Sequence, residues 1–330
     1  MSMIIHCFSN DSLIHSPSMK IACYDVGSNT IRCLIGIKEP SYFHIEQIWR
    51  KITRLAGGFA DGYLAEDSIN RSLSVLVEFA ELANLQGVEE HRMALTGVMR
   101  KAKNAGKFLE DIRRKTNITP YIISGSAEGQ LSFKGARWAL TISESEISAL
   151  ADIGGFSTEF TIGNHGESES ISCNIGVVRM TEDLASSDPI SREDLESMQN
   201  AATQYLEPIH GLMLKISTST LPKLIANAGT ATTLAAMDLR LKTYSPSLVN
   251  GYNIKKDRVE NLLQKLAATP KNQRLDAFPG LEQGREDLMP AGMILALEIM
   301  KQMGSDELMV SIGGILHGLL MSDNWPVKNY

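Results

Sequence analysis

The chain has 330 residues and a formal net charge of −6, with 43% hydrophobic and 21% charged residues. This length predicts two domains with ample buried core, and the composition is that of a globular protein. The acidic balance argues against a general nucleic-acid binder, and no apolar run approaches the ~20 residues of a membrane-spanning helix. A local basic cluster can still bind a small anionic substrate.

The N-terminal stretch and the cysteines indicate the compartment. Residues 1–18 lack the basic start and long apolar stretch of a signal peptide, so we expect a loosely ordered extension there. The cysteines, Cys7, Cys23, Cys33 and Cys173, form no Cys-x-x-Cys pair, which favours reduced thiols over disulfides or zinc. We therefore expect a cytoplasmic protein.

A glycine-containing turn between two short strands opens the folded part of the chain. The first strand ends in Asp25, the turn is 26–29, and further strands are expected at 31–37 and 42–52. Glycine lets backbone N–H groups approach an oxyanion closely, and serine or threonine hydroxyls add donors, so such a turn can hold phosphate. Asp25 would add a hard oxygen ligand for a divalent cation.

A helix and a basic cluster follow this hairpin. Apolar residues recur at helical spacing over 69–83, and Gly87 can end that helix. Arg100, Lys101 and Lys103 then stand at an expected helix start. Such a cluster is commonly a solvated helix face. Its position between two phosphate-type turns favours phosphate capture instead, for which the arginine fork is suited.

The next marked segment is a turn at 125 that leads into a helix. Glu128 falls in the first turn of that helix. From spacing alone, a carboxylate at this place is a partner of the helix dipole.

A second hairpin over 150–163 repeats the first. Its first strand ends in Asp152, its turn contains Gly154, Gly155, Ser157 and Thr158, and another strand is expected at 168–175. One such stretch alone could be a tight turn with a solvated aspartate. Because the pattern occurs twice, the sequence predicts two related lobes, each offering a phosphate-binding hairpin to a shared cleft.

The last motif is a glycine turn that follows a short strand at 224–226. Gly229 and Thr230 precede a helix expected from Thr232, where an anion could meet helix N–H groups. Simple helix capping explains the same residues equally well.

Four segments, in this order, resemble motifs of the exopolyphosphatase and guanosine pentaphosphate phosphohydrolase (Ppx/GppA phosphatase) family. They are Asp25-Val-Gly-Ser-Asn-Thr-Ile-Arg32, Thr96-Gly-Val-Met-Arg-Lys-Ala-Lys-Asn104, Ile123-Ser-Gly-Ser-Ala-Glu-Gly-Gln-Leu131 and Asp152-Ile-Gly-Gly-Phe-Ser-Thr-Glu159. The resemblance extends over 20–320, which is nearly the whole chain. A single Asp-x-Gly hairpin would be weak evidence, but the second and third segments are narrower in distribution.

The resemblance implies an α/β chain with the two-lobed actin, Hsp70 and sugar-kinase (ribonuclease H-like) fold, duplicated around a central cleft. We expect lobe I over 19–128 and lobe II over 129–330. A C-terminal helix at about 313–322 is expected to pack back on lobe I.

The resemblance also implies a mechanism, in which Glu128 is the general base and Arg100 helps to stabilise the charge of the transition state. Asp152, with Asp25 or Glu159, would hold Mg²⁺ or another divalent cation. The expected phosphate-binding residues are Gly27, Ser28, Asn29, Arg32, Gly154, Gly155, Ser157, Thr158, Gly229 and Thr230. The implied activity is removal of the terminal phosphate of inorganic polyphosphate, or of the 5′-phosphate of guanosine pentaphosphate.

Some residues depart from the family motifs and keep other functions open. Phe156 replaces a third glycine, Ala127 and Gln130 replace an acid and an arginine beside Glu128, and Ala228 replaces a glycine. These changes bear on substrate preference and turnover. The alternatives are an ATPase or kinase of the same fold and a catalytically weak phosphate or nucleotide sensor. No nucleic-acid or membrane partner is expected, and a homodimer is the candidate assembly.

Overall fold

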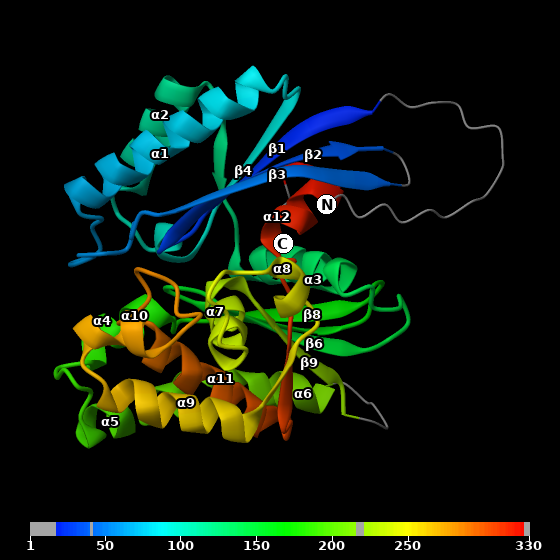
Figure 1. Cartoon of the computed structure of the whole chain (residues 1–330). Coiled ribbons are helices and arrows are strands. Elements are labelled where there is room, and N and C mark those ends of the chain that lie inside the picture. Colours follow the sequence, from blue (N-terminus) through cyan, green and yellow to red (C-terminus); the bar gives the residue numbers. More distant parts are fainter. Residues whose placement is uncertain (1–17, 40–41, 216–220, 327–330) are drawn as a thin grey trace.

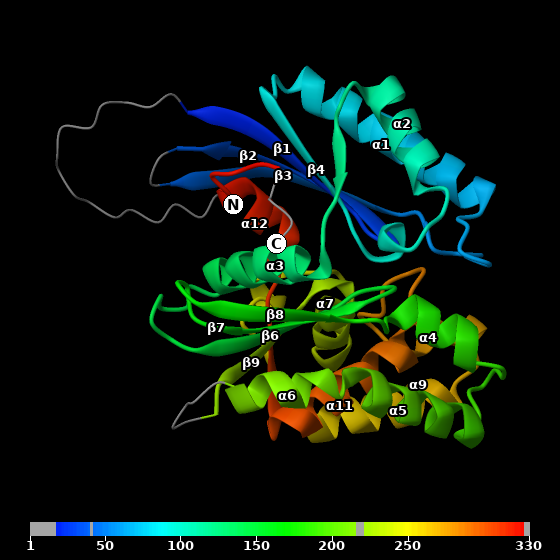
Figure 2. The same ribbon diagram turned by 180° about the vertical axis from the view of Figure 1, so that it is seen from behind.

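The computed structural model describes residues 18–39, 42–215 and 221–326 and forms two lobes, one above the other in Figure 1 and seen from behind in Figure 2. The extension expected at 1–18 lies, except for Ser18, outside the described residues. Within the described ranges, no helix is both long and apolar enough to cross a bilayer.

The first lobe is a five-stranded sheet with two helices on one face. Its elements are β1 (Met19–Val26), β2 (Thr30–Lys38), β3 (Phe43–Ile52), α1 (Glu66–Leu85), β4 (Glu90–Leu95), the 3-10 turn η1 (Gly97–Arg100), α2 (Ala105–Thr116) and β5 (Pro120–Ile122). The strand order is β3-β2-β1-β4-β5. Figure 1 shows α1 and α2 side by side above this sheet.

The second lobe is a six-stranded sheet with the order β10-β11-β9-β6-β7-β8. Its strands are β6 (Ser148–Ile153), β7 (Thr158–Gly163), β8 (Ser168–Cys173), β9 (Lys223–Asn227), β10 (Asn253–Lys255) and β11 (Glu307–Val310). Its helices are α3 (Gly125–Ala139), α4 (Val177–Leu184), α5 (Arg192–Leu206), α6 (Pro208–Lys215), α7 (Ala228–Asp238), α8 (Pro246–Val249), α9 (Lys256–Ala268), η2 (Lys271–Gln273), α10 (Arg274–Ala277), α11 (Met289–Met303) and α12 (Ile315–Met321).

The two sheets share one arrangement, in which the first strand is antiparallel to the second and parallel to the fourth. Asp25 lies opposite Arg32 in the first hairpin, and Asp152 lies opposite Glu159 in the second. Both turns close in the same way: the Gly27 N–H donates to the carbonyl of Thr30 at 3.1 Å, and the corresponding bond of the second turn measures 3.0 Å. This repeat confirms the expected duplicated two-lobed fold.

Strand β1 is buried on both faces, which explains its almost continuous apolar sequence. Alternate residues point to opposite sides: Ala22 and Tyr24 join the core beneath α1 and α2, whereas Ile21 and Cys23 join a second cluster that includes α12. The cysteines of the described ranges, Cys23, Cys33 and Cys173, are buried and free.

Helices α3 and α12 pack against each other between the two sheets (Figures 1 and 2). Helix α3 also contacts β7 and β8, while α12 lies against β1 and β2 of lobe I. The lobe boundary expected between residues 128 and 129 therefore falls inside the first turn of α3. At the α3–α12 crossing, a Cβ added to Gly318 would stand 2.1 Å from the carbonyl oxygen of Leu131.

We expect Gly318→Ala to destabilise the protein by roughly 1–3 kcal/mol, because the added methyl meets rigid backbone rather than a flexible side chain. The matched control is Gly106→Ala in α2, where nothing lies within 4 Å of the added Cβ. That change should leave stability unchanged or raise it by about 0.4–1 kcal/mol. Urea unfolding measures both, and equal effects of the two substitutions would contradict the close crossing.

Candidate functional site

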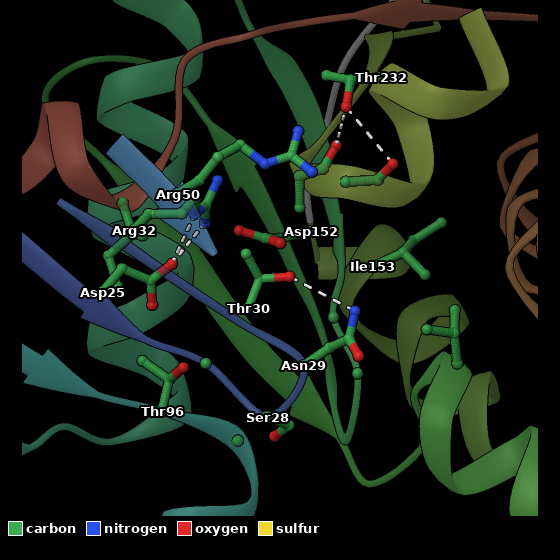
Figure 3. A pocket seen from close by; sticks show the side chains of 18 of the residues that line it. Asp25, Ser28, Asn29, Thr30, Arg32, Arg50, Thr96, Asp152, Ile153 and Thr232 are labelled. Atoms are coloured by element: carbon green, nitrogen blue, oxygen red, sulfur yellow. Dashed lines mark hydrogen bonds and ion pairs between the residues drawn. The ribbon is translucent and has the colours of Figure 1, made fainter. Parts of the chain in front are cut away.

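A cavity of about 410 Å³ lies between the two hairpins and contains most of the residues expected to form the site (Figure 3). The expected residues that line it are Asp25, Gly27, Ser28, Asn29, Arg32, Glu128, Asp152, Gly154, Gly155, Ser157 and Gly229. The fold therefore brings both turns, and the helix that carries Glu128, to one space.

The two hairpin aspartates face this cavity in different electrostatic settings. Arg32 donates to Asp25 Oδ2 from Nε at 3.0 Å and from its terminal nitrogen at 2.5 Å, so the first hairpin neutralises its own carboxylate. Asp152 accepts a hydrogen bond from the Ser132 hydroxyl at 2.6 Å. Burial raises the pKa of Asp152, while Ser132 and Arg32 act in the opposite direction.

Arg100, at the end of η1, is held between two carboxylates of the second lobe. One terminal nitrogen donates to Glu128 Oε2 at 2.5 Å, and the other donates to Glu159 Oε1 at 3.0 Å and to the Ser157 hydroxyl at 2.8 Å. The Ser172 hydroxyl donates to the same oxygen of Glu159 at 2.7 Å. This network fixes the position of Glu128 at the cavity wall.

The same network shifts the pKa values of both carboxyl groups. Burial and, after it, the charge of Glu159 raise the pKa of Glu128 well above its usual range, against the lowering effect of Arg100. Burial raises the pKa of Glu159 to about 7, with Arg100 opposing and Asp152 adding to the shift. Burial lowers the pKa of Arg100, but the two neighbouring glutamates outweigh it and the net shift is upward. Perturbed carboxyl groups of this kind are typical of functional sites.

Four expected site residues, Arg100, Glu159, Thr158 and Thr230, lie behind the cavity wall rather than on it. The Thr158 hydroxyl donates to the carbonyl of Ile175 at 2.7 Å, and the Thr230 hydroxyl donates to that of Ile153 at 3.1 Å. Helix α7 also begins at Ala228, four residues before its expected start at Thr232, so Thr230 stands inside its first turn.

The expected cation ligands were Asp25, Asp152 and Glu159. Among the described residues, no three His, Cys, Asp or Glu side chains converge on a metal-sized site. Asp25 and Glu159 bond to Arg32 and Arg100, respectively, while Asp152 faces the cavity. This donor set fits Mg²⁺ of the kind that one or two carboxylates hold together with substrate phosphates, since Mg²⁺ seldom needs an all-protein cage.

Sequence reasoning did not assign Arg50 and Arg285, which line the cavity beside Arg32. Both pair with Glu282, and Arg285 Nε reaches its Oε2 at 2.8 Å. Burial, followed by the neighbouring guanidinium groups, lowers the pKa of each to about 10. On this side of the cavity, three arginines are bonded to two carboxylates, Asp25 and Glu282, which leaves a local excess of positive charge that Asp152 also faces.

No local sequence pattern assigned these two arginines to the site. Arg50 stands in an ordinary strand pattern, and Arg285 in a loop. Gly229 leaves the space that the Arg285 side chain occupies, because a Cβ at position 229 would collide with its guanidinium. His317 also lines the cavity, and burial, followed by Arg32, lowers its pKa to about 4.

Comparison with known proteins identifies relatives that match most of the chain. The family model described as the Ppx/GppA phosphatase family matches residues 40–324. Exopolyphosphatase 2 of Mycobacterium tuberculosis is 29% identical over 319 residues, covering 92% of this chain and 98% of that protein.

Two solved structures extend this similarity to three dimensions. The Aquifex aeolicus PPX-GPPA enzyme has a TM-score of 0.77 at 27% identity, covering 92% of this chain and 99% of that one. An exopolyphosphatase from Cytophaga hutchinsonii has a TM-score of 0.82 at 26% identity, covering 91% and 96%. The residues matched by the family model include the second hairpin and the helix of Glu128.

We expect Glu159→Gln to change the pH dependence of stability. Because the folded pKa of about 7 exceeds the usual 4.5, the native state binds more protons than the unfolded chain between these values. This carboxyl therefore destabilises the fold progressively as pH rises through that window. As the pH rises from about 5 to 7.5, the free energy of unfolding of the variant should therefore increase by on the order of 1–3 kcal/mol relative to that of wild type. Urea titrations across that range measure the difference, and parallel stability curves would contradict the shift.

Proposed function

The chain belongs to the Ppx/GppA phosphatase family, and from that premise we propose that it hydrolyses the terminal phosphoanhydride bond of inorganic polyphosphate. The observation that carries this proposal is the position of Glu128, a largely buried carboxylate held by Arg100 at the wall of a cavity shared by two phosphate-type turns. The arginine excess at the other side of the cavity favours a polyanionic substrate.

Glu128 is proposed as the general base. Arg100 bonds to its Oε2, which leaves Oε1 for a water molecule in the cavity. The raised pKa moves the carboxyl toward the operating pH, where a general base is most effective. The water oxygen bonds to the terminal phosphorus, its proton passes to Glu128, and the bridging P–O bond breaks so that the bridging oxygen stays with the shortened chain.

The remaining residues stabilise charge on the phosphoryl oxygens. The Ser28 oxygen accepts the Val98 N–H at 2.9 Å, so its hydroxyl proton is directed elsewhere and can donate to phosphate, whereas the Ser157 hydroxyl bonds to both Arg100 and Glu159. Backbone N–H groups of the two turns add donors. Asp152, with Asp25, would hold Mg²⁺, which neutralises phosphate charge when bound.

Guanosine pentaphosphate is a second candidate substrate, and one feature of the cavity favours it. Tyr244 and Ile48 line the arginine side of the cavity and are each about half exposed, at 48% and 46%. An aromatic ring and an apolar side chain beside Arg50 and Arg285 can take a nucleoside next to a phosphate chain. Phosphate release from polyphosphate, guanosine pentaphosphate and ATP, with and without Mg²⁺, tests the choice.

Glu128→Gln should lower the rate of phosphate release by roughly 10²–10⁴-fold, because the amide cannot accept the proton of the attacking water. Substrate binding should persist, since Glu128 is not assigned to the phosphates. Phosphate release and polyphosphate binding are measured on the same preparations. Equal rates for variant and wild type would refute the assignment of the base. Binding without turnover in the wild type would favour the sensor alternative.

Arg50→Gln should raise the KM for polyphosphate roughly tenfold with little change in kcat. The lost guanidinium binds the polyphosphate at a point distant from the phosphorus that reacts, so its loss weakens binding more than it slows the reaction. The matched control is Arg192→Gln on α5, an exposed arginine paired with Glu196 outside the cavity. Steady-state kinetics at two salt concentrations measure both variants. A similar KM change in the control would show that general surface charge, rather than Arg50, attracts the substrate.

A further inference from the structure

Helix α12 and the loop before it contribute Ile312, Ile315 and His317 to the lining of the cavity. His317 is the polar member of this set, and it belongs neither to the two turns nor to the network that holds Glu128. It lines the cavity although only 5% of its surface is exposed. The hydrogen bonds of its two ring nitrogens show whether the imidazole serves the protein interior or the contents of the cavity.

One ring nitrogen of His317 bonds to the protein backbone. The N–H of Gly314 donates to Nδ1 at 3.3 Å, so Nδ1 carries no proton. A neutral imidazole then carries its proton on Nε2. Within the described ranges, no residue accepts a hydrogen bond from this nitrogen. The ring thus keeps one N–H group available for a ligand.

The imidazole is neutral at physiological pH. Burial, followed by the charge of Arg32, lowers the pKa of His317 to about 4. The protonated ring, in which both nitrogens donate, would also lose the hydrogen bond from Gly314. His317 therefore offers a hydrogen bond near Arg32 without adding a second positive charge beside that guanidinium.

Helix α3 holds the imidazole in place. A Cβ added to Gly135 would stand 2.9 Å from His317 Cβ and 2.1 Å from the carbonyl oxygen of Gly314, so α12 begins directly against α3. The ring of Trp138, also on α3, packs against the imidazole with centroids 5.6 Å apart and an interplanar angle of 35°. The free N–H group is thus fixed before a ligand arrives, which lowers the entropic cost of binding.

The contact with α3 also places His317 away from the phosphorus that reacts. Glu128 lies in the first turn of α3, and Gly135 follows seven residues later, about 10 Å along the helix axis. Arg32 interacts electrostatically with both Glu128 and His317, so it is close to each of them. A phosphate chain that has its terminal group at Glu128 and passes Arg32 brings an inner phosphoryl group to His317.

We propose that His317 binds the substrate through its Nε2–H group, which donates to a non-bridging oxygen of an inner phosphoryl group beside Arg32. The proposal rests on the proposed hydrolysis, because it takes that phosphate chain as the ligand. Hydrogen bonds to charged phosphoryl oxygens are stronger than those between neutral groups. Since the bound group does not react, the bond stabilises the bound substrate and the transition state equally, and it lowers KM without changing kcat.

Two substitutions separate the functions of the two ring nitrogens. His317→Asn keeps an acceptor near the place of Nδ1, so the Gly314 N–H stays paired, but it has no donor at the place of Nε2. His317→Gln is one bond longer and brings an amide N–H near the place of Nε2. His317→Asn should raise the KM for polyphosphate roughly tenfold at unchanged kcat, and His317→Gln should recover most of this loss.

Steady-state phosphate release with Mg²⁺ measures both variants, and thermal melting shows whether each is folded. A wild-type KM in folded His317→Asn, with a raised KM in His317→Gln, would show that the ring only pairs the Gly314 N–H and would overturn the proposal. Equal KM values in the two variants would overturn it as well, since the donor at Nε2 would then make no difference.

A second measurement observes the ring in wild type. In protein labelled with ¹⁵N at histidine, the nitrogen chemical shifts report which nitrogen carries the proton, and the His317 signals are those missing from either variant. The proton should be on Nε2, and its signal should shift when tripolyphosphate is added without Mg²⁺. A proton on Nδ1, or no shift, would overturn the role of His317. A shift in a wild type that releases no phosphate would overturn the proposed hydrolysis alone.

Discussion

The structure of the site depends on one partly buried arginine that belongs to one lobe and bonds to acids of the other. Arg100 follows strand β4 of lobe I, yet its partners are Glu128, Ser157 and Glu159 of lobe II. Two buried carboxylates at such close quarters would repel each other strongly without a shared cation. The contact that holds Glu128 therefore exists only when the lobes are together, which makes assembly of the site part of the fold.

The difference between the two copies of the hairpin explains why the guanidinium of Arg100 is needed. At equivalent register positions, the first hairpin pairs Asp25 with Arg32, whereas the second places Glu159 opposite Asp152. The first hairpin contains both members of its ion pair. The second hairpin contains two carboxylates, and the arginine that pairs with Glu159 comes from the other lobe. The two copies of this hairpin thus differ in charge: the first pairs its aspartate with its own arginine, and the second holds a carboxyl whose pKa burial raises to about 7.

The sequence revealed the hairpins because their signal is local: glycine, serine and aspartate at fixed spacing define a turn whatever surrounds it. It also indicated the duplication, since both copies are read in the same way. It could not separate residues that face the cavity from those behind it, as Thr158 and Thr230 show, because adjacent residues point to opposite sides. Arg50 and Arg285 were unassigned since only the closed fold brings their distant segments together.

An edge-on contact between two phenyl rings, Phe59 of the first lobe and Phe156 of the second, also crosses the lobe boundary. Any rotation that parts the lobes must draw these two rings away from each other. Because Arg100 of lobe I holds Glu128 of lobe II, the same rotation would also separate this carboxylate from its arginine.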